Sequence, residues 1–299
     1  VNPPKITSVD SLKERTNRAT KLAVSAETIE EAKAALEAGA DYIYFGSEKE
    51  ISYFSDDILE AKKLLGEKFV WRLPRITEDN SLEAYLSMYK KIKPETVYAD
   101  NLGQIYKLKD KSSKTISGSG LFVMNSLSAL ELQRIGVDEI TLSVELNEGQ
   151  IRDLLKNYNG SVNMVVGEKT LLMIHQSCIL AGVNKCAGDS CKMADYYLKD
   201  RLDYIFDLGF DDKCRSYLYN SQDLALIDHL SDIVSMNVDT ITLDISGRGE
   251  VIVKELTNIY SKALVETKRL GKINVSEYKV RIQAVVGNQL TRGHWHRGV

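Results

Sequence analysis

The sequence predicts a (β/α)8 barrel with a cysteine-rich insertion after the seventh strand and a short C-terminal extension. Eight short apolar segments rich in Val, Ile and Tyr alternate with segments of helical periodicity. This alternation indicates a parallel sheet, and strands buried on both faces have this composition. No G-x-G-x-x-G motif follows the first strand, so the usual sign of the alternative, an open doubly wound sheet that binds a dinucleotide, is missing.

The elements expected in the first half of the barrel begin and end at residues with known local preferences. Thr28 and Glu31 form a capping box that starts the first helix, and Gly39 ends that helix. Pro74 ends the third strand because it cannot donate a ladder hydrogen bond. The strands expected in this half are 22–26, 41–45, 69–73 and 96–99.

The second half of the chain repeats this pattern around the insertion. Asn125 and Asn147 are suited to cap two helices, and Gly136 ends the first of them. The strands expected here are 114–117, 139–143, 162–166 and 240–244, with helices at 221–230 and 250–270. We also expect a small hairpin of strands 196–198 and 202–206, and a strand-like run at 279–286.

These elements predict a leading segment or linker over 1–20, a barrel over 21–270 that contains the cysteine-rich segment 172–220, and an extension over 271–299. The chain begins with Val1 rather than Met, which is consistent with a piece of a longer polypeptide. No apolar run approaches the roughly 18 residues of a membrane helix, and no secretory signal is present, so we expect a cytoplasmic protein.

The net charge of the chain gives no sign of a nucleic-acid-binding protein that is basic over its whole surface. The formal net charge is −3 and 27% of residues are charged, which is ordinary for a globular protein. The overall basic footprint of many nucleic-acid-binding proteins is therefore missing, although a local basic groove is compatible with this composition.

All four cysteines, Cys178, Cys186, Cys191 and Cys214, lie in the insertion. Four thiolates complete a tetrahedral zinc site or hold one cubane cluster. Buried free thiols fit poorly with the polar neighbours, and disulfides fit poorly with the absence of a secretory signal. Zinc sites usually contain two closely spaced cysteine pairs, whereas only one short spacing occurs here, so a [4Fe–4S] cluster is favoured and zinc is the alternative.

The last nine residues contain two histidines, one tryptophan and two arginines. They form either a solvated, frayed end or a segment that folds over the barrel mouth and supplies cations and an aromatic ring.

The chain resembles the U32 family, long labelled peptidase or collagenase-like. The resemblance spans nearly the whole chain and is closest to the C-terminal part of the long U32 proteins. Its most specific parts are the cysteine block and the closing motif. The motifs that carry it are the cysteine block with Leu172-Met173, 198–201 and 218–221, the stretch 73–76 after the third strand, Asn125-Ser126 with 142–146, and the ending 291–294 with 297–299.

The resemblance implies an iron–sulfur protein in which Cys178, Cys186, Cys191 and Cys214 hold a [4Fe–4S] cluster. Several members of the family support oxygen-independent or prephenate-dependent hydroxylation of a tRNA uridine, an rRNA cytidine or a ubiquinone precursor. The implied partners are RNA, a prephenate-like small molecule, and an upstream U32 domain or partner subunit.

The first functional hypothesis is therefore an iron–sulfur-dependent hydroxylase that modifies an RNA base. An RNA substrate needs cations for its phosphates and aromatic rings for its bases, which Arg215, Tyr217, Tyr219 and Trp295 could supply. Each of these residues could instead be a solvated loop residue or part of a barrel ion pair. The residues expected to line the mouth are Arg72, Arg75, Asn125, Glu145, Asp244, Arg248, Arg292 and His294.

Two hypotheses from other classes compete with this one. A protease would need an activated nucleophile or a metal with an open position, yet neither H-E-x-x-H nor G-x-S-x-G occurs, and only Cys178 with His175 could form a dyad. The third hypothesis is a non-catalytic partner of an upstream U32 domain.

Overall fold

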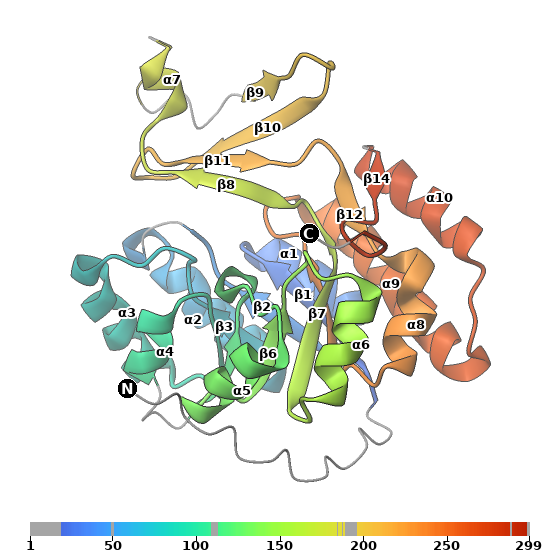
Figure 1. The fold of residues 1–299 in the computed structure, drawn as a ribbon. Helices are drawn as coiled ribbons and strands as arrows, with labels where there is room; N and C mark the ends of the chain where they lie inside the picture. The colour runs from blue at the N-terminus through green and yellow to red at the C-terminus, as the bar shows by residue number, and fades with distance from the viewer. Residues whose placement is uncertain are drawn as a thin grey trace, which may run out of the picture.

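The computed structural model describes residues 19–48, 51–108, 113–183, 185–186, 188, 196–287 and 289–297. Neighbouring barrel strands pair in parallel, and the last of them pairs with both the seventh and the first, which closes the barrel. The predicted α/β barrel is therefore confirmed (Figure 1). Its strands are β1 (Lys21–Ala26), β2 (Tyr42–Phe45), β3 (Phe69–Arg72), β4 (Thr96–Ala99), β5 (Lys114–Ser117), β6 (Glu139–Leu142), β7 (Ser161–Glu168) and β13 (Thr240–Asp244).

Helices surround the barrel and begin at the caps expected from the sequence. The Thr28 hydroxyl accepts a hydrogen bond from the Glu31 amide, Asn125 accepts one from Ser128, and Asn147 forms a capping box with Gln150. The surrounding helices are α1 (Ile29–Glu37), α2 (Ser55–Leu65), α3 (Asp79–Ile92), α4 (Leu102–Leu108), α5 (Ser126–Arg134), α6 (Glu148–Lys156), α8 (Leu230–Ser235) and α9 (Glu250–Leu270). Short 3-10 turns lie at Ile51–Tyr53, Gly66–Lys68, Ser119–Leu121 and Ile227–His229.

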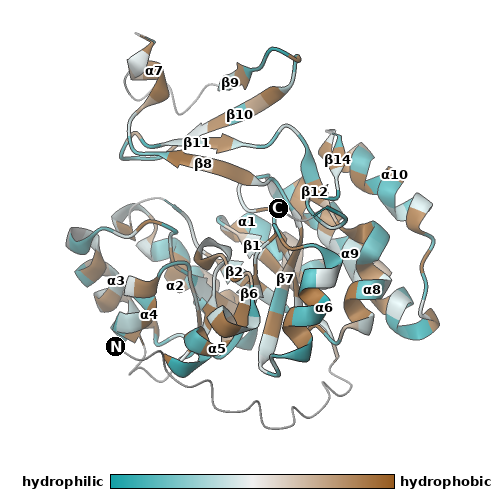
Figure 2. Cartoon of the chain, in the orientation of Figure 1, coloured by the Kyte–Doolittle hydropathy of each residue, from teal (hydrophilic) through white to brown (hydrophobic). Residues whose placement is uncertain are grey.

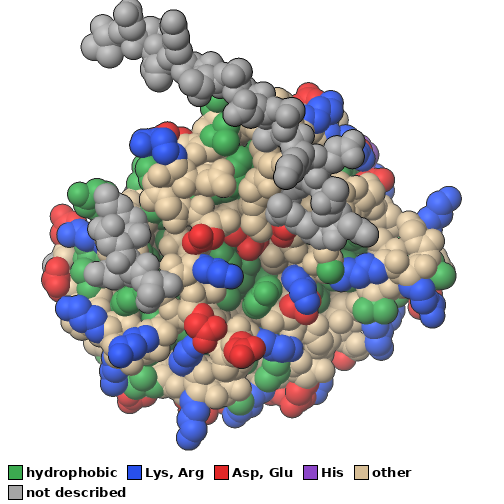
Figure 3. Space-filling view, turned by 90° about the horizontal axis from the view of Figure 1, so that it is seen from below, with side chains coloured by type: hydrophobic (Ala, Val, Ile, Leu, Met, Phe, Trp, Pro, Cys, Tyr) green, Lys and Arg blue, Asp and Glu red, His purple; other side chains and the backbone are tan. Residues whose placement is uncertain are grey.

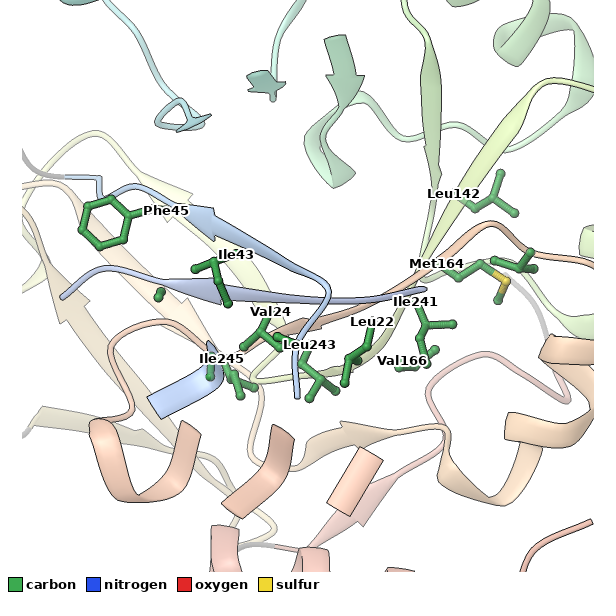
Figure 4. Close-up of a cluster of buried hydrophobic side chains, with 14 of the residues drawn as sticks. Leu22, Val24, Ile43, Phe45, Leu142, Met164, Val166, Ile241, Leu243 and Ile245 are labelled. Carbon is green, nitrogen blue, oxygen red and sulfur yellow. The ribbon is translucent and has the colours of Figure 1, made fainter. Parts of the chain in front are cut away.

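Alternate residues of the strands face two different apolar cores. Leu22 and Val24 of β1 point outward to the main cluster under the helices, whereas Ala23 points into the barrel with Tyr44. Figure 4 shows part of the outer cluster, including Ile241 and Leu243 of β13. In Figure 2 the barrel strands carry brown segments between paler or teal ones, while the helices carry teal segments as well. Successive strand residues therefore alternate between the inside of the barrel and the layer under the helices, and both sets are shielded from solvent.

A four-stranded antiparallel sheet, here called the roof sheet, is inserted between β7 and the last barrel strand. It lies above the carboxyl ends of the barrel strands (Figure 1). The predicted hairpin at 196–206 is confirmed, although its second strand starts at Ile205 because Asp200 accepts hydrogen bonds from the Leu202 and Tyr204 amides and so forms a turn. In spatial order, the roof strands are β8 (Leu171–His175), β11 (Ser216–Tyr219), β10 (Ile205–Phe210) and β9 (Tyr196–Lys199), with α7 (Ile179–Gly182) after β8.

The helix predicted at 221–230 is wrong over its first half. Asp223–Ala225 forms β12, which pairs antiparallel with β7 and parallel with β14 (Leu290–Thr291). Leu224 and Ala225 are buried, and the Leu226 amide donates to the Val166 carbonyl. Pairing with two distant segments therefore overrides the local cap signal at Ser221.

The strand-like run predicted at 279–286 is also wrong, because it lies in helix α10 (Val275–Val286). Tyr278 and Ile282, one helical turn apart, are buried, and the Tyr278 hydroxyl donates to Glu266 of α9. The short run Lys279–Val286 fits the strand period of two and the helix period of 3.6 about equally well, and packing against α9 selects the helix.

The face of the molecule opposite the roof sheet carries interspersed lysines, arginines and acidic residues where it is visible in Figure 3. None of the described helices is long and apolar enough to cross a membrane.

Candidate functional site

A cavity of about 1010 Å³ lies between the carboxyl ends of the barrel strands and the roof sheet. This mouth cavity is where (β/α)8 barrels place their active sites. The roof sheet contributes 171–174, Tyr217 and Tyr219, and the C-terminal extension contributes His294 and Arg297. Three layers of the chain, distant in sequence, therefore enclose one space.

An ion pair between Arg72 and Asp244 spans the floor of the cavity. The guanidinium at the end of β3 donates to both carboxylate oxygens at the end of β13, at 2.6 and 3.1 Å. Burial alone would raise the pKa of Asp244, but the charge and hydrogen bonds of Arg72 outweigh it, so that pKa is lowered. Asp244 is therefore a carboxylate whose oxygens are already engaged.

Glu168 ends β7 directly beside this pair. Asp244 is its register partner on β13, and the Glu168 side chain lines the cavity although the residue is only 9% exposed. Burial, followed by the nearby charge of Asp244, raises the pKa of Glu168 to about 7, while a hydrogen bond to Thr170 opposes the shift. Two neighbouring carboxyl groups thus have pKa values that are pushed apart.

A second buried acid lies across the cavity. Glu48 accepts the Arg75 amide at 3.0 and 3.1 Å, and burial raises the pKa of its carboxyl group. The Arg75 guanidinium donates to the Ser119 hydroxyl at 3.0 Å, which is a neutral partner. Arg75 consequently presents its charge to the cavity.

Two other cations of the cavity wall are paired with carboxylates. Arg248 donates to Asp223 of β12 at 2.5 Å, and Lys169 forms an ion pair with Asp207 of β10. The Lys169 ammonium also lies 5.3 Å from the centre of the Tyr219 ring. The first pair joins the loop after β13 to β12, and the second joins the loop after β7 to the roof sheet.

The cavity includes many of the residues predicted from the sequence. Arg72, Arg75, Glu145, Asp244, Arg248 and His294 line it, together with Tyr217 and Tyr219. The acids Glu27, Glu48 and Glu168, and also Lys169, were not predicted. Glu168 could have been predicted from the sequence, because an acid that follows a buried barrel strand is expected at the mouth of the barrel.

The structure places the other predicted residues away from the cavity wall. Asn125 caps α5, and Arg292 donates to Asp228 at 2.8 and 2.5 Å. Arg215 is buried against Asp211, and Trp295 is buried with its ring stacked on His229 at 4.8 Å. Of the closing motif, His294 and Arg297 reach the mouth while Trp295 anchors the segment beneath it.

The three described cysteines are free thiols at one end of the roof sheet, and Cys191 lies outside the described residues. Cys178 is half-buried before α7, while Cys186 and Cys214 are exposed. The Ser216 hydroxyl accepts the Ile179 amide at 3.0 Å, which brings the chain at Cys178 beside the chain at Cys214. Cys214 occupies a turn with φ of 58°.

These thiols have the donor chemistry of a thiolate-bound metal or cluster. Within the described part of the chain, no three His, Cys, Asp or Glu side chains gather closely enough to hold a metal ion. The donor types therefore fit such a group, whereas a complete ligand set would also need Cys191.

Comparisons with known proteins identify the family. The sequence model of peptidase family U32 matches residues 69–298, and no curated protein sequence matches the chain significantly. The solved structure of the U32 peptidase Mk0906 is similar at 11% identity and a TM-score of 0.47, over 80% of this chain and 96% of that one.

Two lyases show the same degree of likeness. A putative lyase/mutase from Burkholderia cenocepacia J2315 has 11% identity and a TM-score of 0.43 over 88% of each chain. A 2,3-dimethylmalate lyase has 8% identity and a TM-score of 0.46 over 90% of each chain. The family match covers most of the sequence and agrees with the resemblance in the cysteine block and closing motif, and on this ground the chain belongs to peptidase family U32.

Proposed function

We propose that this U32 protein binds a [4Fe–4S] cluster through its four cysteines and hydroxylates a base of RNA without molecular oxygen. The observation that carries the proposal is the position of the cysteines. They belong to the same insertion that forms the roof of the mouth cavity, so a cluster bound there would be joined to the cavity-lining strands β8 and β11 through the roof sheet.

The cavity wall has side chains suited to a nucleobase. Tyr219 of β11 offers an aromatic ring on which a base can stack, and Arg75 offers a guanidinium for a phosphate or carboxylate. The neighbouring Tyr217 is almost fully buried, and its hydroxyl donates to Asp211 at 3.0 Å, which fixes its ring in the cavity wall. Arg75 would equally suit the carboxylate of a prephenate-like oxygen donor.

The cysteines would hold the cluster at the end of the roof sheet, where it would supply or accept single electrons. Cys178 and Cys214 are brought together by the Ser216 contact, and Cys186 follows α7. The protein's own part is to exclude water from the mouth and to hold the base against the floor made by Arg72 and Asp244.

The test starts with anaerobic purification, optical and EPR spectra, and iron and sulfide analysis. We expect about four iron and four sulfide per chain, lost in Cys214→Ser and retained in the surface variant Ser235→Ala. A colourless protein with one zinc or no metal would contradict the cluster. Mass spectrometry of RNA from cells lacking the gene should then reveal one missing hydroxylation, and unchanged RNA would contradict the substrate.

The alternative hypothesis, that the chain is a peptidase, rests on the names of the family and of the Mk0906 protein. The candidate dyad is Cys178 with His175, whose Nδ1 already contacts the Ser177 backbone at 2.9 and 3.2 Å. Cleavage of a denatured protein by the purified chain, abolished by Cys178→Ser and retained after chelation of iron, would favour this alternative.

A further inference from the structure

We propose that Glu168 is the proton-transfer residue of the mouth cavity and that the Arg72–Asp244 pair positions it. The inference rests on the proposed function for the identity of the ligand, a nucleobase with a carbonyl oxygen. The role of Glu168 itself is argued from its place in the barrel.

The first argument is the position of the side chain. Glu168 is the last residue of β7, at the carboxyl end where barrel enzymes place reacting groups. It lines the cavity from the barrel side, facing the roof sheet that carries Tyr217 and Tyr219. A base stacked on Tyr219 would therefore lie in the same cavity as the Glu168 carboxyl group.

The second argument is a division of roles between neighbouring acids. Asp244 is the register partner of Glu168, and both of its oxygens are engaged by Arg72. Asp244 cannot take up a proton without losing its buried ion pair with Arg72. Glu168 has Thr170 as its hydrogen-bond partner rather than a cation, so its proton is free to move.

The third argument is electrostatic and supports the geometry. The groups that act on Glu168 are the carboxylate of Asp244 and the guanidinium groups of Arg72 and Arg75, in addition to Thr170. Burial and Asp244 favour the neutral acid, with a pKa of about 7. A group of this kind exchanges protons most effectively near neutral pH.

The transfer is simple in chemical terms. The O–H bond of the neutral Glu168 carboxyl breaks as a new O–H bond forms on a carbonyl oxygen of the bound base, while negative charge develops on that oxygen during the reaction. Glu168 is left as a carboxylate, which the charge of Arg75 stabilises, and it takes up a proton from water after the base leaves. No electrons are exchanged, and no co-reactant is needed for this step.

The first test follows the carboxyl group directly by infrared titration of the anaerobically purified protein. Burial raises the pKa of Glu139 to about 7 as well, so the acid band that titrates near pH 7 should contain two components. We expect the component of Glu168 to disappear in Glu168→Gln and to persist in Glu48→Gln and in Glu139→Gln. In Asp244→Asn the unpaired Arg72 should lower the midpoint of the Glu168 component by about one pH unit or more. A titration near pH 7 that survives in the double variant Glu168→Gln/Glu139→Gln, or a Glu168 midpoint below pH 5, overturns the proposal.

The second test uses cells that lack the gene, complemented with variants whose cluster content is verified. If an RNA hydroxylation is restored by the wild type and falls about 100-fold or more with Glu168→Gln, the proposal is supported. Full restoration by Glu168→Gln overturns the role of Glu168 and leaves the proposed function standing. If deletion removes no hydroxylation, the proposed function fails, and the infrared titration alone decides whether Glu168 carries a mobile proton.

Discussion

The Asp211 carboxylate organises the turn that presents Cys214. Its Oδ1 accepts the amides of Lys213 and Arg215 at 3.0 and 2.9 Å, and its Oδ2 accepts Arg215 Nε at 2.5 Å. Asp211 and Arg215 side chains are each 4% exposed. A single buried carboxylate thus determines both the conformation of the turn and the neutralisation of the neighbouring arginine.

Asp211→Asn should therefore lower stability and, if the proposed cluster is present, its retention as well. Leaving the buried Arg215 with only the more distant Glu78, at 4.0 Å, costs about 3 kcal/mol of unfolding free energy, and we expect the iron content of the proposed cluster to fall markedly. The measurements are urea unfolding and iron analysis. Asp203→Asn, which breaks the exposed Lys199–Asp203 pair of the same sheet, is the matched control and should change neither.

Glu31 occupies a position where many barrels bind a phosphate. Its buried carboxylate accepts the amides of Gly249 at 2.8 Å and of Gly247 at 3.2 Å, just before α9, and also the Glu27 amide at 2.9 Å. Both glycines have positive φ, 86° and 77°, which allows their amides to converge. The anion site after the last strand is therefore filled by the chain itself.

Glu31→Gln should lower the free energy of unfolding by about 1–3 kcal/mol, because a neutral amide oxygen replaces a charged acceptor and its NH2 group meets donors. Equilibrium urea unfolding measures the loss. Glu30→Gln, an exposed acid in the same helical turn, serves as control. Equal stability of the two variants would show that the Glu31 hydrogen bonds contribute nothing.

At the scale of elements, the C-terminal segment is held by a cluster of rings. His229 stacks on Trp295 at 4.8 Å and meets the edge of His296 at 5.0 Å. Burial, then His296 and Arg292, lowers the pKa of His229, against the opposing influence of Asp228 and Asp232. The docked segment therefore requires the neutral imidazole.

Docking should weaken as pH falls. The pKa of His229 is lower in the folded protein than in the unfolded chain, so its contribution is complete above about pH 6.5, the ordinary value, and is lost progressively below it. The protection factors of residues 290–297, which allow for the slower chemical exchange at lower pH, should fall between about pH 6.5 and pH 5. His229→Phe keeps the stacking without a titratable ring and should abolish the pH dependence, and an unchanged dependence would contradict this account.

Local signals explain which elements were predictable. The barrel strands carry their own apolar runs and caps, so their order followed from the sequence. Strands β8 and β11 were not predicted, because they pair with each other across 41–48 positions of the chain and have mixed polarity; β11 pairs with the nearby β10 as well. The cavity acid Glu48 was missed for a related reason, because no local pattern places it in the cavity wall, whereas Glu168 follows a buried strand and could have been predicted.

At the scale of the whole molecule, the roof sheet is tied to the barrel at a point remote from its own connections. Lys213 forms an ion pair with Glu78, the residue before α3, at 2.9 Å. Because the Lys213 side chain is 24% exposed, the pair is only partly shielded from water. Its main effect is therefore to hold the roof sheet over the mouth rather than to stabilise the entire fold.

Lys213→Ala should change the free energy of unfolding by less than about 1 kcal/mol while accelerating hydrogen exchange in β10 and β11. Exchange of the barrel strands should not change, which separates opening of the roof sheet from unfolding of the domain. Lys199→Ala, within the roof sheet itself, is the control for loss of an exposed lysine. A uniform acceleration across roof and barrel would contradict the proposed tie.

Closure of the barrel has a consequence for how the protein is made. Lys21 of β1 pairs with Thr240 of β13, 219 positions further along the chain. A growing chain leaves the ribosome from its N-terminus, so the roof sheet and all four cysteines emerge before the strand that completes the barrel. The thiols are thus exposed while the barrel is still an open sheet, and the proposed cluster could be inserted at that stage.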